Sequence, residues 1–299
     1  VGKRRLCFTL SIILILAGPA TMLIHKATGG KALNYSLEFM GGTSTNVTFN
    51  EDYSIEEIDE KVKPVVQEVT GDANIQATKV SGSNQVIIKT RELSLDERTE
   101  LSQKLNEKFG VDESTITAES ISSTVSNEMR QDAIVAVIIA AICMLIYIWL
   151  RFKDIRFGAS AVLALLHDVL IVLAFYAIAR ISVGNTFIAC MLTIIGYSIN
   201  ASIVIFDRIR ENLGNSKKHS DEALKEIVNR SITQTLTRSI YTSLTTFITI
   251  AALFILGVPS IREFAAPLIV GIVAGAFSSV CISGPLWYIL KTKFKGKNK

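Results

Sequence analysis

Long apolar stretches, separated by short polar segments, recur along most of the chain. A helix of about 20 mainly apolar residues crosses a bilayer core about 30 Å thick, and six stretches reach or approach that length. This pattern predicts an α-helical polytopic membrane protein with six transmembrane helices. The stretches are Leu6–Ile24, Ala133–Leu150, Phe157–Ala179, Gly184–Phe206, Ile240–Val258 and Ala265–Leu290.

The segment between the first two stretches is more polar and has a periodicity of its own. Ser54 with Glu57, and Ser94 with Glu97, have the spacing of a capping box, which predicts two helix starts. Strand-like runs surround both helices, so the order is strand, helix, strand, strand, helix, strand. This order predicts a small α+β domain of the ferredoxin-like βαββαβ type. The runs are Thr43–Phe49, Ala73–Val80, Gln85–Thr90 and Thr115–Ser122, with a hairpin turn at Ser81–Asn84.

Basic residues predict the orientation in the membrane. Eighteen Lys and Arg residues flank the stretches on the side that both chain ends share, while the opposite short loops hold only Arg180 and Arg262. Because Lys and Arg accumulate on the cytoplasmic side of membrane proteins, both termini are expected in the cytoplasm. The polar segment is then extracytoplasmic.

These patterns divide the chain into three parts. Residues 1–26 form the cytoplasmic N-terminus and transmembrane helix 1, residues 27–130 the extracytoplasmic domain, and residues 131–299 transmembrane helices 2–6. Near 220–237, apolar residues fall on one helical face, which predicts an amphipathic helix along the cytoplasmic membrane surface. Residues 3–20 also fit a cleaved signal peptide, but its removal would leave five helices and spoil the charge asymmetry.

Composition narrows the class of protein. The chain is 49% hydrophobic and 19% charged, which is too apolar for a soluble protein of this size, and its net charge of +4 is explained by the membrane flanks. We therefore expect no nucleic-acid partner. No nucleophile–base pair or metal-ligand spacing occurs, so we expect no enzyme, no metal and no cofactor. The four cysteines, Cys7, Cys143, Cys190 and Cys281, all lie in apolar runs.

Ionisable residues inside the apolar stretches are the candidates for function, because an ionisable group in hydrocarbon is costly. Asp168 lies near the middle of the third stretch, next to His167. Either Asp168 handles a proton or ion, or it makes a structural hydrogen bond to a neighbouring helix. Arg238 belongs to a polar stripe that favours a bundle interior, although it could instead reach the lipid headgroups. The other members of the stripe are Thr235, Thr242, Thr245 and Thr249.

The fourth and sixth stretches carry further signals. Gly196–Asn212 is unusually polar for a membrane helix, and Asp207 falls at its cytoplasmic boundary, where an interfacial helix end is the simplest interpretation. Gly271 and Gly275 have the small-xxx-small spacing that lets another helix approach closely.

Four segments together carry a resemblance to a known family. They are Phe39–Thr43 after the first stretch, His167–Asp168, Gly196–Asn212 and Thr233–Arg238. Together they resemble the SecF family of bacterial protein-export proteins, part of the SecD/SecF family and the RND superfamily. The motif positions are Gly41, Gly42, Gly196, Tyr197, Ser198, Asn200, Asp207 and Arg208.

The resemblance implies a partner and an activity. SecD, of similar design, would complete a pseudo-symmetric twelve-helix unit in the bacterial cytoplasmic membrane. This unit assists translocation of unfolded polypeptide through the SecYEG channel and uses the proton motive force. The start at Val1 rather than Met fits the SecF half of a SecD–SecF fusion.

One position departs from the family pattern. In the family, the residue after Gly-Tyr-Ser-Ile-Asn is commonly acidic. The family resemblance implies that proton transfer takes place at this acid, together with the arginine that matches Arg238. Here this residue is Ala201, which can neither carry a proton nor pair with Arg238. Asp168 or a SecD carboxylate would then be the coupling acid, or coupling has been lost, or the alanine was introduced.

Two other functions are compatible with parts of the sequence. A small-molecule efflux half-transporter of the RND superfamily usually carries larger extracytoplasmic insertions than residues 27–130. A non-transporting, membrane-anchored binding module would need neither Asp168 in mid-membrane nor the Arg238 stripe.

Overall fold

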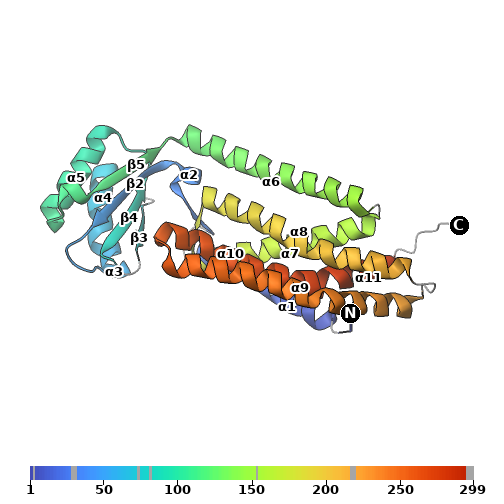
Figure 1. Cartoon of the computed structure of the whole chain (residues 1–299). Helices are drawn as coiled ribbons and strands as arrows, with labels where there is room; N and C mark the ends of the chain where they lie inside the picture. The colour runs from blue at the N-terminus through green and yellow to red at the C-terminus, as the bar shows by residue number, and fades with distance from the viewer. Residues whose placement is uncertain are drawn as a thin grey trace. The chain divides into compact units, whose positions relative to one another are not determined.

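The computed structural model describes residues 1–2, 4–27, 32–72, 75–80, 83–152, 154–215 and 220–293. The chain divides into two compact units, residues 1–34 with 135–299 and residues 35–134. The first unit consists of long helices and the second of a sheet with helices (Figure 1). Ala73 and Asn74, and the first two residues of the expected turn at Ser81–Asn84, lie outside the described residues.

The prediction of six membrane-spanning helices is confirmed. Six helices in the described part of the chain are long and apolar enough to cross a membrane. The sixth passes through a π-helical turn, Ser279–Ser283, between two α-helical segments. The helices are α1 (Arg4–Ala27), α6 (Ser123–Phe152), α7 (Ile155–Ala179), α8 (Asn185–Gly214), α9 (Asp221–Leu256), and α10 (Pro259–Ser278) continuing into α11 (Gly284–Lys293).

Helix α9 differs from the expectation for residues 220–237. These residues are helical and begin at the N-cap Ser220, as expected, but they run without interruption into the fifth apolar stretch. The reason is that neither Pro nor Gly occurs between Asp221 and Leu256, so nothing ends the helix between its amphipathic and apolar parts.

The helical unit is held together by aromatic and small-residue packing. Phe157 of α7 stacks on Trp287 of α11 with ring centroids 4.9 Å apart, and Phe206 of α8 packs on Phe157 at 5.1 Å. A methyl group on Gly271 would overlap the Ile194 side chain, and one on Gly275 would lie 3.3 Å from Ser198 Cβ. Helices α8 and α10 therefore approach closely at these two glycines.

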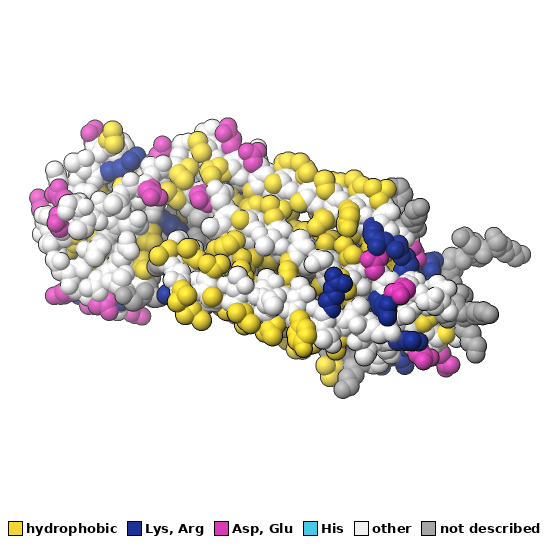
Figure 2. All heavy atoms as spheres, viewed as in Figure 1, with side chains coloured by type: hydrophobic (Ala, Val, Ile, Leu, Met, Phe, Trp, Pro, Cys, Tyr) yellow, Lys and Arg dark blue, Asp and Glu magenta, His cyan; other side chains and the backbone are white. Residues whose placement is uncertain are grey.

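The outer surface of the helical unit suits a lipid environment. Large apolar side chains such as Leu6 on α1, Ile138 on α6 and Leu256 on α9 are exposed. Apolar side chains cover much of the visible surface of these helices in Figure 2. Exposed apolar area on this scale is unfavourable in water and is matched by hydrocarbon.

The second unit contains one antiparallel sheet and two main helices. Its strands are β2 (Gly42–Thr48), β3 (Gln76–Lys79), β4 (Gln85–Thr90) and β5 (Thr117–Ile121), in the order β3-β4-β2-β5. The first helix combines α3 (Ile55–Glu57), a π-helical turn (Ile58–Val62) and α4 (Lys63–Thr70), and the second is α5 (Leu95–Phe109). The remaining short elements of this unit are α2 (Leu37–Met40) and a 3-10 turn (Glu113–Thr115). Strand β6 (Ser182–Val183) belongs to the first unit, and β1 (Asn34–Tyr35) lies at the boundary in sequence between the two units.

Both predicted capping boxes are confirmed. Ser54 and Ser94 accept hydrogen bonds from the backbone N–H of Glu57 and Glu97, and both glutamates bond back to the cap. The hydrogen bond from Arg91 and, secondly, the one from the Ser94 N–H lower the pKa of Glu97 to about 2. The core between sheet and helices is apolar and includes Val47, Ile88, Leu101 and Leu105.

Gly41 and Gly42 owe their place in the motif to backbone conformation. Their φ angles are +71° and +106°, a region that residues with a Cβ rarely adopt. A Cβ on Gly42 would also overlap the carbonyl oxygen of Thr90 on the neighbouring strand. The two glycines therefore allow the chain to enter β2 beside β4.

Candidate functional site

The carboxyl group of Asp168 lies at the centre of the helical unit. Its exposure is 0%. Ser278 of α10 donates a hydrogen bond to Oδ2 at 2.7 Å, and Ser198 of α8 donates to the same oxygen. His167 Nδ1 lies 2.8 Å from the other oxygen, Oδ1. One carboxyl group of α7 thus connects three membrane helices.

This network accepts Asp168 in both protonation states. When the carboxyl is ionised, a neutral His167 donates its Nδ1–H to Oδ1, and both serine hydroxyls donate to Oδ2. When Oδ1 gains a proton, its O–H donates to Nδ1 and the serine bonds to Oδ2 persist. The exchange requires that the histidine proton move to Nε2. That atom is buried and has no hydrogen-bond partner among the described residues, so the second tautomer leaves its N–H without an acceptor in this part of the chain.

The sequence identified Asp168 but not its partners. Neighbouring residues on a helix point about 100° apart, so the direct contact of His167 with Asp168 was not expected from the spacing. Ser198 was singled out as a motif residue on one face with Tyr197 and Ala201, which is wrong because Ser198 bonds to Asp168 and Tyr197 to Ser243. Ser278 was not singled out at all. The available signal for Ser278 was a hydroxyl close to the Gly271–Gly275 packing face.

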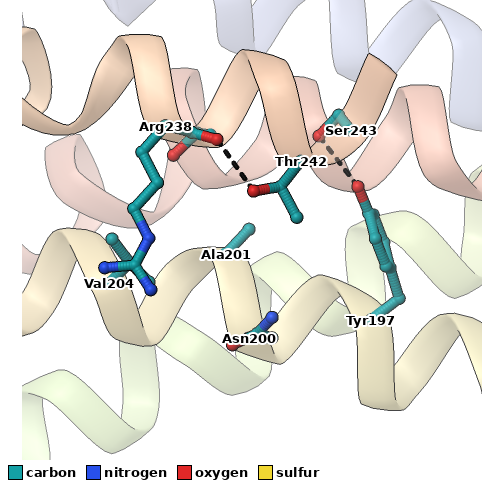
Figure 3. Close-up of a pocket in the computed structure, with 8 residues that line it drawn as sticks. Tyr197, Asn200, Ala201, Val204, Arg238, Thr242 and Ser243 are labelled. Carbon is teal, nitrogen blue, oxygen red and sulfur yellow. Dashed lines mark hydrogen bonds between the residues drawn. The ribbon is translucent and has the colours of Figure 1, made fainter. Parts of the chain in front are cut away.

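A second polar site lies between α8 and α9. It is a cavity of about 100 Å³, with Ala201 on one wall and Arg238 on the other. Figure 3 shows Arg238 reaching from α9 toward α8 near Val204, with Ala201 facing the same space. The Tyr197 hydroxyl donates to Ser243 Oγ at 2.9 Å across the helix pair. The complete lining is Tyr197, Asn200, Ala201, Val204, Arg238, Ser239, Thr242 and Ser243.

Arg238 is exposed on the surface of this chain, so the expectation that it lies in the bundle interior is wrong for the chain by itself. The physical reason is that α9 packs on α8 and α10 through a stripe that shares only Thr235 with the predicted one. Thr242, Thr245 and Thr249 are exposed, and their hydroxyls donate to carbonyls of their own helix. The buried stripe is Ser231, Thr235, Ser239 and Ser243, which recur every four residues.

The two polar sites lie on different faces of α8. Ser198 points to Asp168, whereas the adjacent Tyr197 points to Ser243 on α9. The structure therefore brings Ala201 and Arg238 together, and it places Asp168 in a separate network.

Asp207 and Arg208 form ion pairs at the end of α8. Asp207 lies 2.8 Å from Arg151 and 3.5 Å from Arg210. Arg208 donates to Gln234 Oε1 at 2.7 Å and pairs with Glu211 at 2.6 Å. These half-exposed pairs fit an interfacial helix end. Within the described residues, no three His, Cys, Asp or Glu side chains are grouped so that they could hold a metal ion.

Comparisons with known proteins agree on one family. The model of the family "Protein export membrane protein SecD/SecF, C-terminal" matches residues 101–293. The chain is 37% identical to the protein translocase subunit SecF of Sebaldella termitidis, over 89% of this chain and 84% of that protein. It is 39% identical to SecF of Gemmatimonas aurantiaca, over 94% of this chain and 84% of that protein.

A solved structure shows the same architecture. SecDF of Thermus thermophilus, a translocon-associated membrane protein, superposes with a TM-score of 0.80 at 32% identity. The match covers 97% of this chain but 38% of the SecDF chain. With six apolar helices that can span a membrane and these relatives, the chain is a multi-pass membrane protein of the SecD/SecF family.

Proposed function

We propose that this chain is the SecF-type subunit of a bacterial Sec export machinery. With a SecD partner it assists the movement of unfolded polypeptide through SecYEG and draws on the proton motive force. Relatives that match over most of their length are named protein translocase subunit SecF. The chain corresponds to 38% of a SecDF chain, which leaves room for a SecD part supplied by a fusion or a second subunit.

The observation that carries this proposal is the buried carboxyl of Asp168. Use of a proton gradient requires a group inside the membrane that gains and loses a proton. Asp168 is fully buried and its hydrogen bonds suit both protonation states, through the tautomer change of His167. In a chain with Ala201 at the position that is commonly acidic in the family, Asp168 is the proton carrier that we propose.

Arg238 supplies the positive charge of the second polar site. It faces Ala201 across the cavity, and Tyr197 connects the two helices through Ser243. In our proposal this fixed positive charge acts on charged groups near the second polar site, because a guanidinium stays protonated in any protein environment.

The proposed orientation places both termini in the cytoplasm of a bacterial cell and residues 27–130 outside. In Figure 2, Lys and Arg side chains gather where α8 ends and α9 begins. Arg151, Arg208 and Arg210 lie in this region. The strand and helix order of residues 42–121, with sheet order β3-β4-β2-β5, supports a ferredoxin-like extracytoplasmic domain.

Export assays test the proposed coupling region. In cells depleted of the native subunit, we expect Arg238→Ala at matched expression to reduce export severalfold. Asp207→Asn should reduce it less than Arg238→Ala does, because half-exposed ion pairs contribute only about 0–1 kcal/mol. Arg262→Ala is the control for loss of one positive charge elsewhere. Normal export by Arg238→Ala together with failure of Asp207→Asn would show that the second polar site serves packing only.

Cysteine labelling tests the orientation. Ser83 is exposed in the second unit and Glu226 is exposed in the first part of α9. On a background with the four native cysteines replaced by alanine, Ser83→Cys should react with a membrane-impermeant maleimide in intact cells whose outer barrier, where present, is permeable. Glu226→Cys should react only after the membrane is broken. The reverse pattern would invert the proposed topology.

A further inference from the structure

Helix α6 leaves a groove open beside α7. Its last turns are packed, since Ile148 is 1% exposed and Phe152 is 5% exposed. A Cβ on Gly158 of α7 would lie 3.9 Å from Ile148 Cγ2, so the two helices meet near the connection between them. None of residues 135–147 is buried, and the structure describes all of them. This part of α6 is therefore left largely uncovered by the described part of the chain.

The groove between α6 and α7 has the polarity and the length of one lipid leaflet. Its volume is about 620 Å³, and all of its lining side chains are apolar, with Leu145 and Ile146 on the α6 side. On α7 it extends from Ile155 to Leu163, which is about 12 Å at 1.5 Å per residue. Half of a bilayer core is about 15 Å thick. The groove therefore offers an extended acyl chain an apolar surface of matching length.

Two carboxylates near the connection between α6 and α7 each lie close to two cations. Asp207 lies 2.8 Å from Arg151 and 3.5 Å from Arg210. Asp154 likewise lies within 4 Å of two cations. Four positive charges against two negative charges leave an excess of two positive charges in this group of described residues. The cations at Asp154 are Arg156, at 3.8 Å, and Lys291, at 3.5 Å.

This excess of positive charge lies where the groove ends. Arg156 directly follows Ile155, and Arg151 lies five residues after Ile146, or about 7.5 Å along α6. The four cationic side chains are between 25% and 47% exposed, so an anionic group outside the chain can approach them. Cations next to a membrane-spanning helix attract anionic lipids. The apolar groove and the charge at its end thus match the two halves of one lipid molecule.

We propose that the groove between α6 and α7 binds an anionic phospholipid. One acyl chain lies along the groove, and the phosphate-bearing headgroup lies at the excess of positive charge. A zwitterionic phospholipid has similar chains but no net charge, so the site prefers the anionic lipid. In the proposed orientation the bound lipid belongs to the cytoplasmic leaflet. The binding itself depends neither on that orientation nor on the proposed role in export.

Native mass spectrometry of the full chain tests the charged part of the site. Titration with phosphatidylglycerol should give one saturable lipid adduct, and phosphatidylethanolamine should bind at least about fivefold more weakly. Arg151→Gln and Arg156→Gln should each weaken phosphatidylglycerol binding about fivefold, and both together about 25-fold. Even the double variant leaves each carboxylate one cation. Arg5→Gln, the control at an exposed cation of α1, should bind the lipid as the unmodified chain does.

Filling the groove gives an independent arm of the test. Val162→Trp places a large side chain in the groove and keeps every charge, so phosphatidylglycerol binding should fall about tenfold or more through lost acyl-chain contacts. Ala159→Phe, at an exposed lining position, should have the same effect if Val162→Trp lowers the thermal unfolding midpoint. Leu256→Trp, at a position of α9 that is 84% exposed, is the control and should leave binding unchanged.

Three results would overturn the proposal. The first is equal binding of phosphatidylglycerol and phosphatidylethanolamine. The second is unchanged phosphatidylglycerol binding in the double arginine variant or in a folded variant with a filled groove. The third is loss of the bound lipid when the chain assembles with a SecD partner, because a helix of the partner would then occupy the groove.

Discussion

Asp168→Asn is expected to abolish the stimulation of export by the proton motive force while the protein stays folded. The asparagine amide has nearly the size of the carboxyl group, and its oxygen can still accept from Ser198 and Ser278. It cannot gain or lose a proton. Export should therefore fall to the level that remains when an uncoupler is added, and the uncoupler should have no further effect on this variant.

Three comparison variants separate proton transfer from packing. Asp132→Asn makes the same chemical change at an exposed position and should leave export unchanged. Ser278→Ala removes one donor to Asp168 and should cost about 1–3 kcal/mol of stability with only partial loss of export. Asp168→Leu should lower the thermal unfolding midpoint more than the other variants do, because the hydroxyls of Ser198 and Ser278 lose the carboxyl oxygen that accepts their hydrogen bonds. An Asp168→Asn variant that still responds to the uncoupler would exclude Asp168 as the proton carrier.

Gly42→Ala is expected to destabilise residues 35–134 by about 2–6 kcal/mol, from the backbone conformation and the steric overlap together. A non-glycine residue at such a φ costs about 1–3 kcal/mol, and the overlap of its Cβ with the Thr90 carbonyl oxygen adds about 1–3 kcal/mol. Amide hydrogen exchange in the full-length protein should show the β2 and β4 amides opening about a hundredfold more often.

Gly71→Ala is the matched control for this substitution. Gly71 also has a positive φ, +61°, but a Cβ there would meet no atom within 4 Å. The expected cost is therefore about 1–2 kcal/mol, from the left-handed conformation alone. Equal exchange rates in the two variants would show that the close approach of β2 to β4 does not explain the Gly41–Gly42 motif.

The sequence was most informative where a local rule decides the structure. The six apolar stretches reflect the bilayer thickness, and each can be found without knowledge of its neighbours. Ser54 and Ser94 predicted their helix starts because a capping box is completed within four residues. The continuity of α9 could also have been expected, since its sequence contains no helix breaker.

The sequence was least informative where distant segments meet. Asp168 was recognised as costly in a membrane, but Ser278 is 110 residues away along the chain, and no local pattern connects them. The exposure of Arg238 depends on which stripe of α9 packs on α8, and both stripes have helical spacing. The cost of a side chain at Gly42 comes from Thr90, which is adjacent only after the strands have paired.

Helix α8 carries both polar sites on neighbouring residues, and this has a mechanical consequence. Ser198 is bonded to Asp168 and packs against Gly275, while Tyr197 is bonded to Ser243 on α9. Because a helix turns as a rigid rod, a rotation of α8 that separates Ser198 from the carboxyl also swings Tyr197 away from its serine. A rotation of α8 therefore changes both hydrogen bonds together, so a rearrangement at one polar site alters the side-chain contacts at the other.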